Sequence, residues 1–211
     1  MPRAEQVLEL DSPHGPARAH VTVAEQARLA LVLGHGAGGG VQAPDLRAAR
    51  DAALAARASV ALVEQPYRVA GRRSAAPARQ LDAAWIAVVE QLADRALHGL
   101  PIVTGGRSSG ARVACRTATE TGAVGVLCLA FPLVPPQRRT ASAPPPSRQP
   151  ELDAVTVPTL VVQGESDRFG MPADGPRRTV VRLRGDHRLA SDIPGVRAAV
   201  GDWLAALGRA R

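Results

Sequence analysis

The sequence predicts an α/β fold: an open, mostly parallel sheet with helices on both faces. Short apolar runs alternate with longer segments whose apolar residues recur at helical spacing. From residue 29 onward the strand pattern and the helix pattern take turns, as parallel strands joined by crossover helices require. A chain of 211 residues can bury one sizeable core, so we expect a single domain over residues 1–211.

Each element is expected from its own pattern. The predicted strands are 6–10, 17–23, 29–33, 59–64, 101–104, 124–129, 159–163 and 179–183, and the predicted helices are 44–56, 79–96, 109–121 and 193–207. The first two strands have no helix between them, which favours an antiparallel hairpin at one edge. Residues 132–150 are rich in Pro, Ser and Arg and predict an extended loop, either a minimal lid or a plain surface connector.

Composition narrows the classes of function. All 26 basic residues are arginines, spread along the chain without a basic run that contains aromatics, so the net charge of +7 does not predict a nucleic-acid partner. The absence of lysine excludes a Walker A phosphate loop. No apolar run is long enough for a membrane span or a signal peptide, so we expect a cytoplasmic protein with no membrane partner. Cys115 and Cys128 lack metal-ligand spacing and are expected to be buried thiols, with no metal site.

The segment GGRSSG at 105–110 carries the most specific motif. It follows a predicted strand and opens a predicted helix, and strand, Gly-x-Ser-x-Gly and helix in this order are typical of a nucleophile elbow. Ser108 has glycines at both flanking motif positions, whereas a register centred on Ser109 would put Arg107 where the turn needs a very small residue. Ser108 is therefore the predicted nucleophile, and the backbone N–H of Ser109 is one predicted oxyanion donor.

An acid and a base follow in the order that a triad requires. Asp167 comes shortly after the predicted strand 159–163, with Glu165 as a competitor closer to the strand end. His187 follows the last predicted strand and is the only histidine after Asp167. We therefore predict that His187 is the general base for Ser108 and that Asp167 orients it.

The glycine-rich segment GHGAGGG at 34–40 completes the predicted site. A loop of this type after a strand can present backbone N–H groups to an oxyanion, here those of Ala37 or Gly38, while His35 braces the loop. The same letters match the dinucleotide fingerprint G-x-G-x-x-G, with Glu64 placed to bind a ribose. Two strands precede this loop, whereas the fingerprint usually opens its fold, and a dinucleotide site leaves the predicted triad without a role.

Four stretches resemble a known family: GHGAG at 34–38, EQPYRVAGR at 64–72, GGRSSGARVA at 105–114 and DH at 186–187. They are similar to the compact α/β-hydrolases related to dienelactone hydrolases, above all to the subgroup named for a testis-expressed protein and a subunit of a histone-acetyltransferase complex. The resemblance covers nearly the whole chain and implies the α/β-hydrolase fold with Ser108, Asp167 and His187 as its triad. It implies no particular substrate, and some relatives act as scaffolds, so a non-catalytic interaction module is the alternative.

Arginines near the predicted site suggest a substrate charge. Arg68, Arg72 and Arg73 lie in a loop that leaves the carboxyl end of a predicted strand, and Arg107 precedes the nucleophile. We expect them to rim the pocket and favour an anionic acyl group, with simple solvation of a basic surface as the alternative. The sequence thus predicts a small serine esterase that acts on a small-molecule acyl substrate and needs no metal or organic cofactor.

Overall fold

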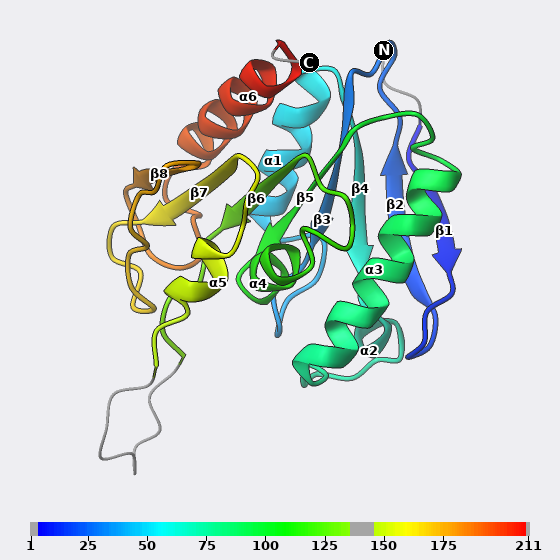
Figure 1. Ribbon diagram of the computed structural model, residues 1–211, viewed down its shortest axis with the longest axis horizontal. Helices are drawn as coiled ribbons and strands as arrows, with labels where there is room; N and C mark the ends of the chain where they lie inside the picture. Colours follow the sequence, from blue (N-terminus) through cyan, green and yellow to red (C-terminus); the bar gives the residue numbers. More distant parts are fainter. Residues whose placement is uncertain (1–3, 136–145, 210–211) are drawn as a thin grey trace.

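The computed structural model describes residues 4–135 and 146–209, which form an eight-stranded sheet in the order β1-β2-β4-β3-β5-β6-β7-β8 (Figure 1). The strands are β1 (Gln6–Leu10), β2 (Ala17–Thr22), β3 (Leu29–Gly34), β4 (Ala58–Glu64), β5 (Ile102–Arg107), β6 (Gly125–Leu129), β7 (Thr159–Gly164) and β8 (Arg178–Leu183). The helices are α1 (Pro44–Ala55), α2 (Pro66–Val69), α3 (Ala78–Asp94), α4 (Ser109–Arg116), α5 (Gln149–Asp153) and α6 (Ile193–Arg209).

The pairing confirms the predicted mostly parallel sheet. β1 and β2 pair antiparallel at one edge, and β2 pairs antiparallel with β4. All pairings from β3 onward are parallel. Every residue of β3 is buried, because a central parallel strand is covered on both faces, whereas the edge strand β8 is only partly covered.

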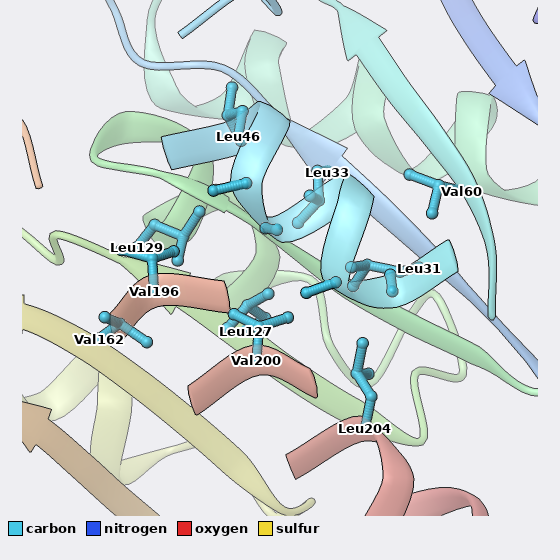
Figure 2. Close-up of a cluster of buried hydrophobic side chains, with 14 of the residues drawn as sticks. Leu31, Leu33, Leu46, Val60, Leu127, Leu129, Val162, Val196, Val200 and Leu204 are labelled. Carbon is cyan, nitrogen blue, oxygen red and sulfur yellow. The ribbon is translucent and has the colours of Figure 1, made fainter. Parts of the chain in front are cut away.

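Helices cover both faces, as predicted. On one face α1 and α6 pack together over the sheet, where Leu31 and Leu33 of β3 belong to the same buried cluster as Val200 and Leu204 of α6 (Figure 2). On the other face lies α3, whose Trp85 is buried against β1 to β5, together with α4 and α5. Alternate residues of β3 therefore belong to two different clusters, because successive side chains of a strand point to opposite faces of the sheet.

Several element bounds differ from the expected ones for local reasons. β5 runs on to Arg107 because its two glycines pack directly against the neighbouring strands β3 and β6. α4 ends at Arg116 rather than at 121, and the hydroxyls of Thr117 and Thr121 bond to backbone carbonyls one turn back, which competes with regular helix. The short helices α2 and α5 were not predicted, and each has a proline at its first or second position.

The register brings the carboxyl ends of the site-bearing strands together. Gly34 at the end of β3 pairs with Gly106 in β5, and Gly164 at the end of β7 pairs with Leu183 at the end of β8. The loops that leave these strands therefore meet at one edge of the sheet, where ligands of open α/β sheets bind.

Part of the predicted loop 132–150 falls outside the described residues, namely 136–145. Its described last two residues, Gln149 and Pro150, form the start of α5 instead of loop. Among the described residues no helix is both long and apolar enough to cross a membrane.

Candidate active site

Ser108 sits on a tight, strained turn between β5 and α4. Its backbone has φ 53° and ψ −109°, a region that residues with a Cβ rarely adopt. A Cβ on Gly106 would lie 2.5 Å from the carbonyl oxygen of Gly34, and a Cβ on Gly110 would overlap the same carbonyl. Only glycine fits at these two positions, so the motif GGRSSG is needed for the turn to form.

Ser108, His187 and Asp167 form one hydrogen-bonded chain. The Nε2 atom of His187 lies 3.0 Å from Oγ of Ser108, and its Nδ1 lies 2.8 Å from Oδ2 of Asp167. Because an ionised carboxylate only accepts, Nδ1 carries the ring proton and Nε2 is left to accept the hydroxyl proton of Ser108. The structure thus brings together the three side chains that the sequence predicted, from the ends of β5, β8 and β7.

Asp167 is buried and held on both oxygens. Its Oδ1 accepts the backbone N–H of Phe169 at 2.9 Å, and its Oδ2 accepts the side-chain amide of Gln163 at 2.8 Å as well as the imidazole. The ring of Phe169 packs edge-on against His187, with centroids 4.5 Å apart. Glu165, the alternative acid, is exposed on the same loop.

Gln163 is a residue that the sequence interpretation missed. It is fully buried at the end of β7, and its Nε2 also faces the carbonyl oxygens of Gly170 at 2.8 Å and Phe131 at 3.1 Å. All these neighbours only accept, so the amide nitrogen must point toward them and toward Asp167. The Oε1 atom is buried without a hydrogen-bond partner in the described part of the chain. A polar residue at the end of the apolar run Leu160–Val162 was the available signal.

The residues whose backbone N–H groups are the predicted oxyanion donors lie beside Ser108. Ser109 is the first residue of α4, so its N–H has no partner within the helix. Gly36 and Gly39 close a turn through a 3.1 Å hydrogen bond, which does not use the N–H groups of Ala37 and Gly38. A Cβ on Gly36 would lie 3.6 Å from Cβ of Ser108, so this loop lies against the elbow. The predicted oxyanion donors Ser109, Ala37 and Gly38 all line the cavity at Ser108.

His35 and Tyr67 hold the glycine loop. His35 is buried; its Nδ1 donates to the carbonyl of Gly36 at 2.9 Å, and its Nε2 accepts the N–H of Gln65 at 3.1 Å. The hydroxyl of Tyr67 donates to the carbonyl of Ala37 at 2.9 Å. That carbonyl shares a planar peptide with the N–H of Gly38, so the tyrosine also fixes the direction of this donor.

The dinucleotide alternative finds no support in these positions. The side chain of Glu64, expected to bind a ribose, lies 3.2 Å from His20 and 3.4 Å from Arg18 in β2. The helix after the glycine loop begins only at Pro44, rather than directly on the glycines.

Arg107 lines the cavity at Ser108, as predicted, and its hydrogen bonds also tie three segments together. Its Nε donates to Oδ2 of Asp45 at 2.8 Å, and its terminal nitrogen donates to the backbone carbonyl of His187 at 3.1 Å. It also packs on Gly36 of the glycine loop. The side chain of Asp45 is completely buried, and burial raises the pKa of this carboxyl against the attraction of Arg107.

The remaining predicted arginines lie away from Ser108, which corrects the expected rim. A cavity of about 510 Å³ opens at Ser108, and the described residues that line it do not include Arg68, Arg72 or Arg73. Arg68 in α2 donates to the backbone of Arg72, and Arg72 lines a separate small cavity between α2 and α3. The short helix α2 packs against β2 and places Arg72 beside α3. Three other arginines line the cavity at Ser108: Arg112, Arg148 and Arg168.

The comparisons with known proteins agree with this fold. The sequence profile of the α/β hydrolase domain family matches residues 27–180, so the chain belongs to this family. No curated protein matches the chain at a significant level. Many solved structures share the fold.

Three of these structures show how far the fold similarity extends. A serine hydrolase without a lid from Xanthomonas campestris is 19% identical, with a TM-score of 0.71 over 96% of this chain and 94% of that chain. Est1E from Butyrivibrio proteoclasticus is 14% identical, with a TM-score of 0.77 over 97% and 99%. A dienelactone hydrolase from Anabaena variabilis is 16% identical, with a TM-score of 0.71 over 97% and 96%.

The buried pair of Arg107 and Asp45 generates a stability prediction. Arg107→Met should lower the free energy of unfolding by about 3–5 kcal/mol, because it leaves a buried carboxylate without its cation. The double variant Arg107→Met/Asp45→Asn should be more stable than Arg107→Met alone at neutral pH, because the amide carries no charge. Urea unfolding of both variants measures this difference. Arg197→Met, which removes an exposed pair with Asp51, is the control and should cost about 1 kcal/mol or less. A double variant that is less stable than Arg107→Met would contradict the account.

His35 generates a prediction about pH. Burial lowers the pKa of His35 from its usual 6.5, although the hydrogen bond to Gly36 opposes this. As pH falls through about 6.5, His35 binds a proton in the unfolded chain before it does so in the folded protein, so the free energy of unfolding falls. The loss of stability caused by His35→Gln should therefore be largest near about pH 8 and shrink toward about pH 5, as measured by denaturant unfolding. His98→Gln, at an exposed histidine, should show no such trend. An effect of His35→Gln that is equal at all pH values would refute the assignment.

Proposed function

We propose that this protein is a serine hydrolase that cleaves small carboxylic esters. The observation that carries the proposal is the chain from Ser108 through His187 to Asp167, with distances of 3.0 and 2.8 Å, beside backbone N–H groups that line the same cavity. Membership of the α/β hydrolase domain family supports it. The cavity of about 510 Å³ suits a small acyl group.

The first half of the proposed reaction forms an acyl-enzyme. Oγ of Ser108 attacks the ester carbonyl carbon while Nε2 of His187 takes the hydroxyl proton. The carbonyl oxygen becomes an oxyanion, which accepts the N–H of Ser109 and that of Ala37 or Gly38. When the C–O bond to the alcohol breaks, His187 returns the proton to the departing alkoxide. Asp167 keeps the imidazole in the required tautomer and stabilises its transient positive charge.

The second half regenerates the enzyme. A water molecule takes the place of the alcohol, His187 removes its proton, and the hydroxide attacks the acyl carbon. The tetrahedral intermediate uses the same N–H groups. Its collapse releases the carboxylic acid and returns the proton to Ser108. All proton transfers use one nitrogen of one histidine, and no metal or organic cofactor takes part in this scheme.

Ester hydrolysis by Ser108 variants tests the proposal. Wild-type protein should release 4-nitrophenolate from 4-nitrophenyl acetate and butyrate, and Ser108→Ala should lower kcat by at least about 10³-fold. Ser109→Ala is the matched control, because this residue contributes only its backbone N–H, and it should keep most of the activity. Folding is checked by circular dichroism. Equal rates for wild type and folded Ser108→Ala, or no ester turnover at all, would sink the proposal and favour a non-catalytic interaction module.

Gln163 should act as a positioning residue for Asp167. Gln163→Leu removes the amide that holds Oδ2, so kcat should fall by about tenfold while KM changes little, since Gln163 does not line the cavity. Gln65→Leu is the matched control: it removes another buried amide, one that donates to the carbonyl of Leu81. Both variants should lose comparable thermal stability. A normal kcat in Gln163→Leu, or an equal loss of kcat in Gln65→Leu, would show that Gln163 has only a structural role.

A further inference from the structure

The lining of the cavity beside Ser108 is rich in arginine. Its lining includes Arg107, Arg112, Arg148 and Arg168, and no aspartate or glutamate among the described residues. An open cavity lined by one sign of charge attracts ligands of the opposite sign. Which of the four guanidinium groups are available decides whether this charge can bind a ligand.

Two of the four arginines are already neutralised by carboxylates. Arg107 is paired with the buried Asp45. Arg112 makes two hydrogen bonds to Glu151 in α5, at 2.9 and 2.5 Å. The single bond of Arg107 to Asp45 and the paired bonds of Arg112 to Glu151 fix both arginine side chains in the wall of the cavity.

Arg148 and Arg168 have no carboxylate partner among the described residues. The half-buried guanidinium of Arg148 donates to the backbone carbonyl of Pro132 at 3.0 Å. Burial and the nearby cations of Arg112 and Arg116 lower the pKa of Arg148, although the attraction of Glu151 opposes this. The guanidinium of Arg168 lies 4.8 Å from the ring centre of Phe169, the ring that packs on His187.

The loops that carry Arg148 and Arg168 are both bonded to one short segment, residues 132–134, which follows β6. The backbone N–H of Arg148 donates to the carbonyl of Leu133 at 2.7 Å, and the N–H of Val134 donates to the carbonyl of Phe169 at 2.9 Å. The segment after β6 therefore connects the two arginine-bearing loops. Its first residue, Pro132, lines the cavity with Arg148 and Arg168. The backbone holds both side chains at the same opening.

We propose that the substrates of this protein are esters that carry a carboxylate, bound by Arg148 and Arg168 while Ser108 attacks the ester carbonyl. A planar guanidinium matches a carboxylate with two parallel hydrogen bonds, and a half-buried cation without a carboxylate partner gains most from one. This inference rests on the proposed esterase function and names its substrate class. It moves the anion-binding role to two arginines other than those to which the sequence analysis assigned it, which were Arg68, Arg72, Arg73 and Arg107.

Matched pairs of esters test the proposal. 4-Nitrophenyl hydrogen adipate is compared with 4-nitrophenyl hexanoate for a carboxylate on the acyl side, and 3-acetoxybenzoate with its methyl ester for one on the alcohol side. Wild type should favour the charged ester of at least one pair by about tenfold or more in kcat/KM, and that pair assigns the side. Arg148→Gln/Arg168→Gln should lower this preference by about 10- to 100-fold. The preference should also weaken as salt is added.

The control removes the same charge elsewhere. Arg72→Gln/Arg73→Gln takes two arginines from exposed positions outside the cavity and should keep the wild-type preference. If the Arg148/Arg168 double variant does not fold, Arg168→Gln alone, at an exposed side chain, should show a smaller loss of preference in the same direction. Equal kcat/KM for charged and neutral esters in wild type would overturn the inference and leave the esterase function intact. So would an equal loss of preference in the control. Absence of turnover for every ester would instead refute the esterase function itself.

Discussion

The close backbone contact between Gly34 and the two glycines around Ser108 is the constraint on which the site depends. Gly34 in β3 pairs with Gly106 in β5. The carbonyl of Gly34 leaves no room for a Cβ on either Gly106 or Gly110. Because the chain can approach so closely, the turn folds back and holds Ser108 at φ 53°. The glycine loop continues directly from Gly34, so the same contact brings the candidate oxyanion donors beside the candidate nucleophile.

Buried polar side chains then hold the surrounding loops to this turn. Arg107 connects the elbow with Asp45 at the start of α1 and with the backbone of His187. Gln163 holds Asp167, and His35 holds the glycine loop. Each of these groups is buried at a cost, which is visible in the raised pKa of Asp45 and the lowered pKa of His35. In the proposed mechanism these groups hold the geometry of the site, and none of them exchanges a proton with the substrate.

The sequence predicted the sheet, and it singled out the three triad candidates that the structure brings together, because these signals are local. A central strand such as β3 is an uninterrupted apolar run, and Ser108, Asp167 and His187 each lie within a few residues after a predicted strand, in a known order. Contacts between distant segments gave no such signal. Arg107 lies 62 residues from Asp45, so its pairing could not be predicted, although its place in the lining of the cavity was. Arg168 adjoins Asp167 and could have been placed at the site, whereas nothing local to Arg148 indicates the cavity.

Covalent labelling with a fluorophosphonate probe, followed by peptide mapping, tests the central claim most directly. The probe reacts with a serine hydroxyl only where a base removes its proton and N–H donors receive the phosphoryl oxygen. One adduct, on Ser108, is expected in folded wild-type protein, and the labelling rate should be strongly reduced in His187→Ala. Folded wild-type protein that takes up no probe, or takes it up on another residue, would contradict the assignment of Ser108 as an activated nucleophile.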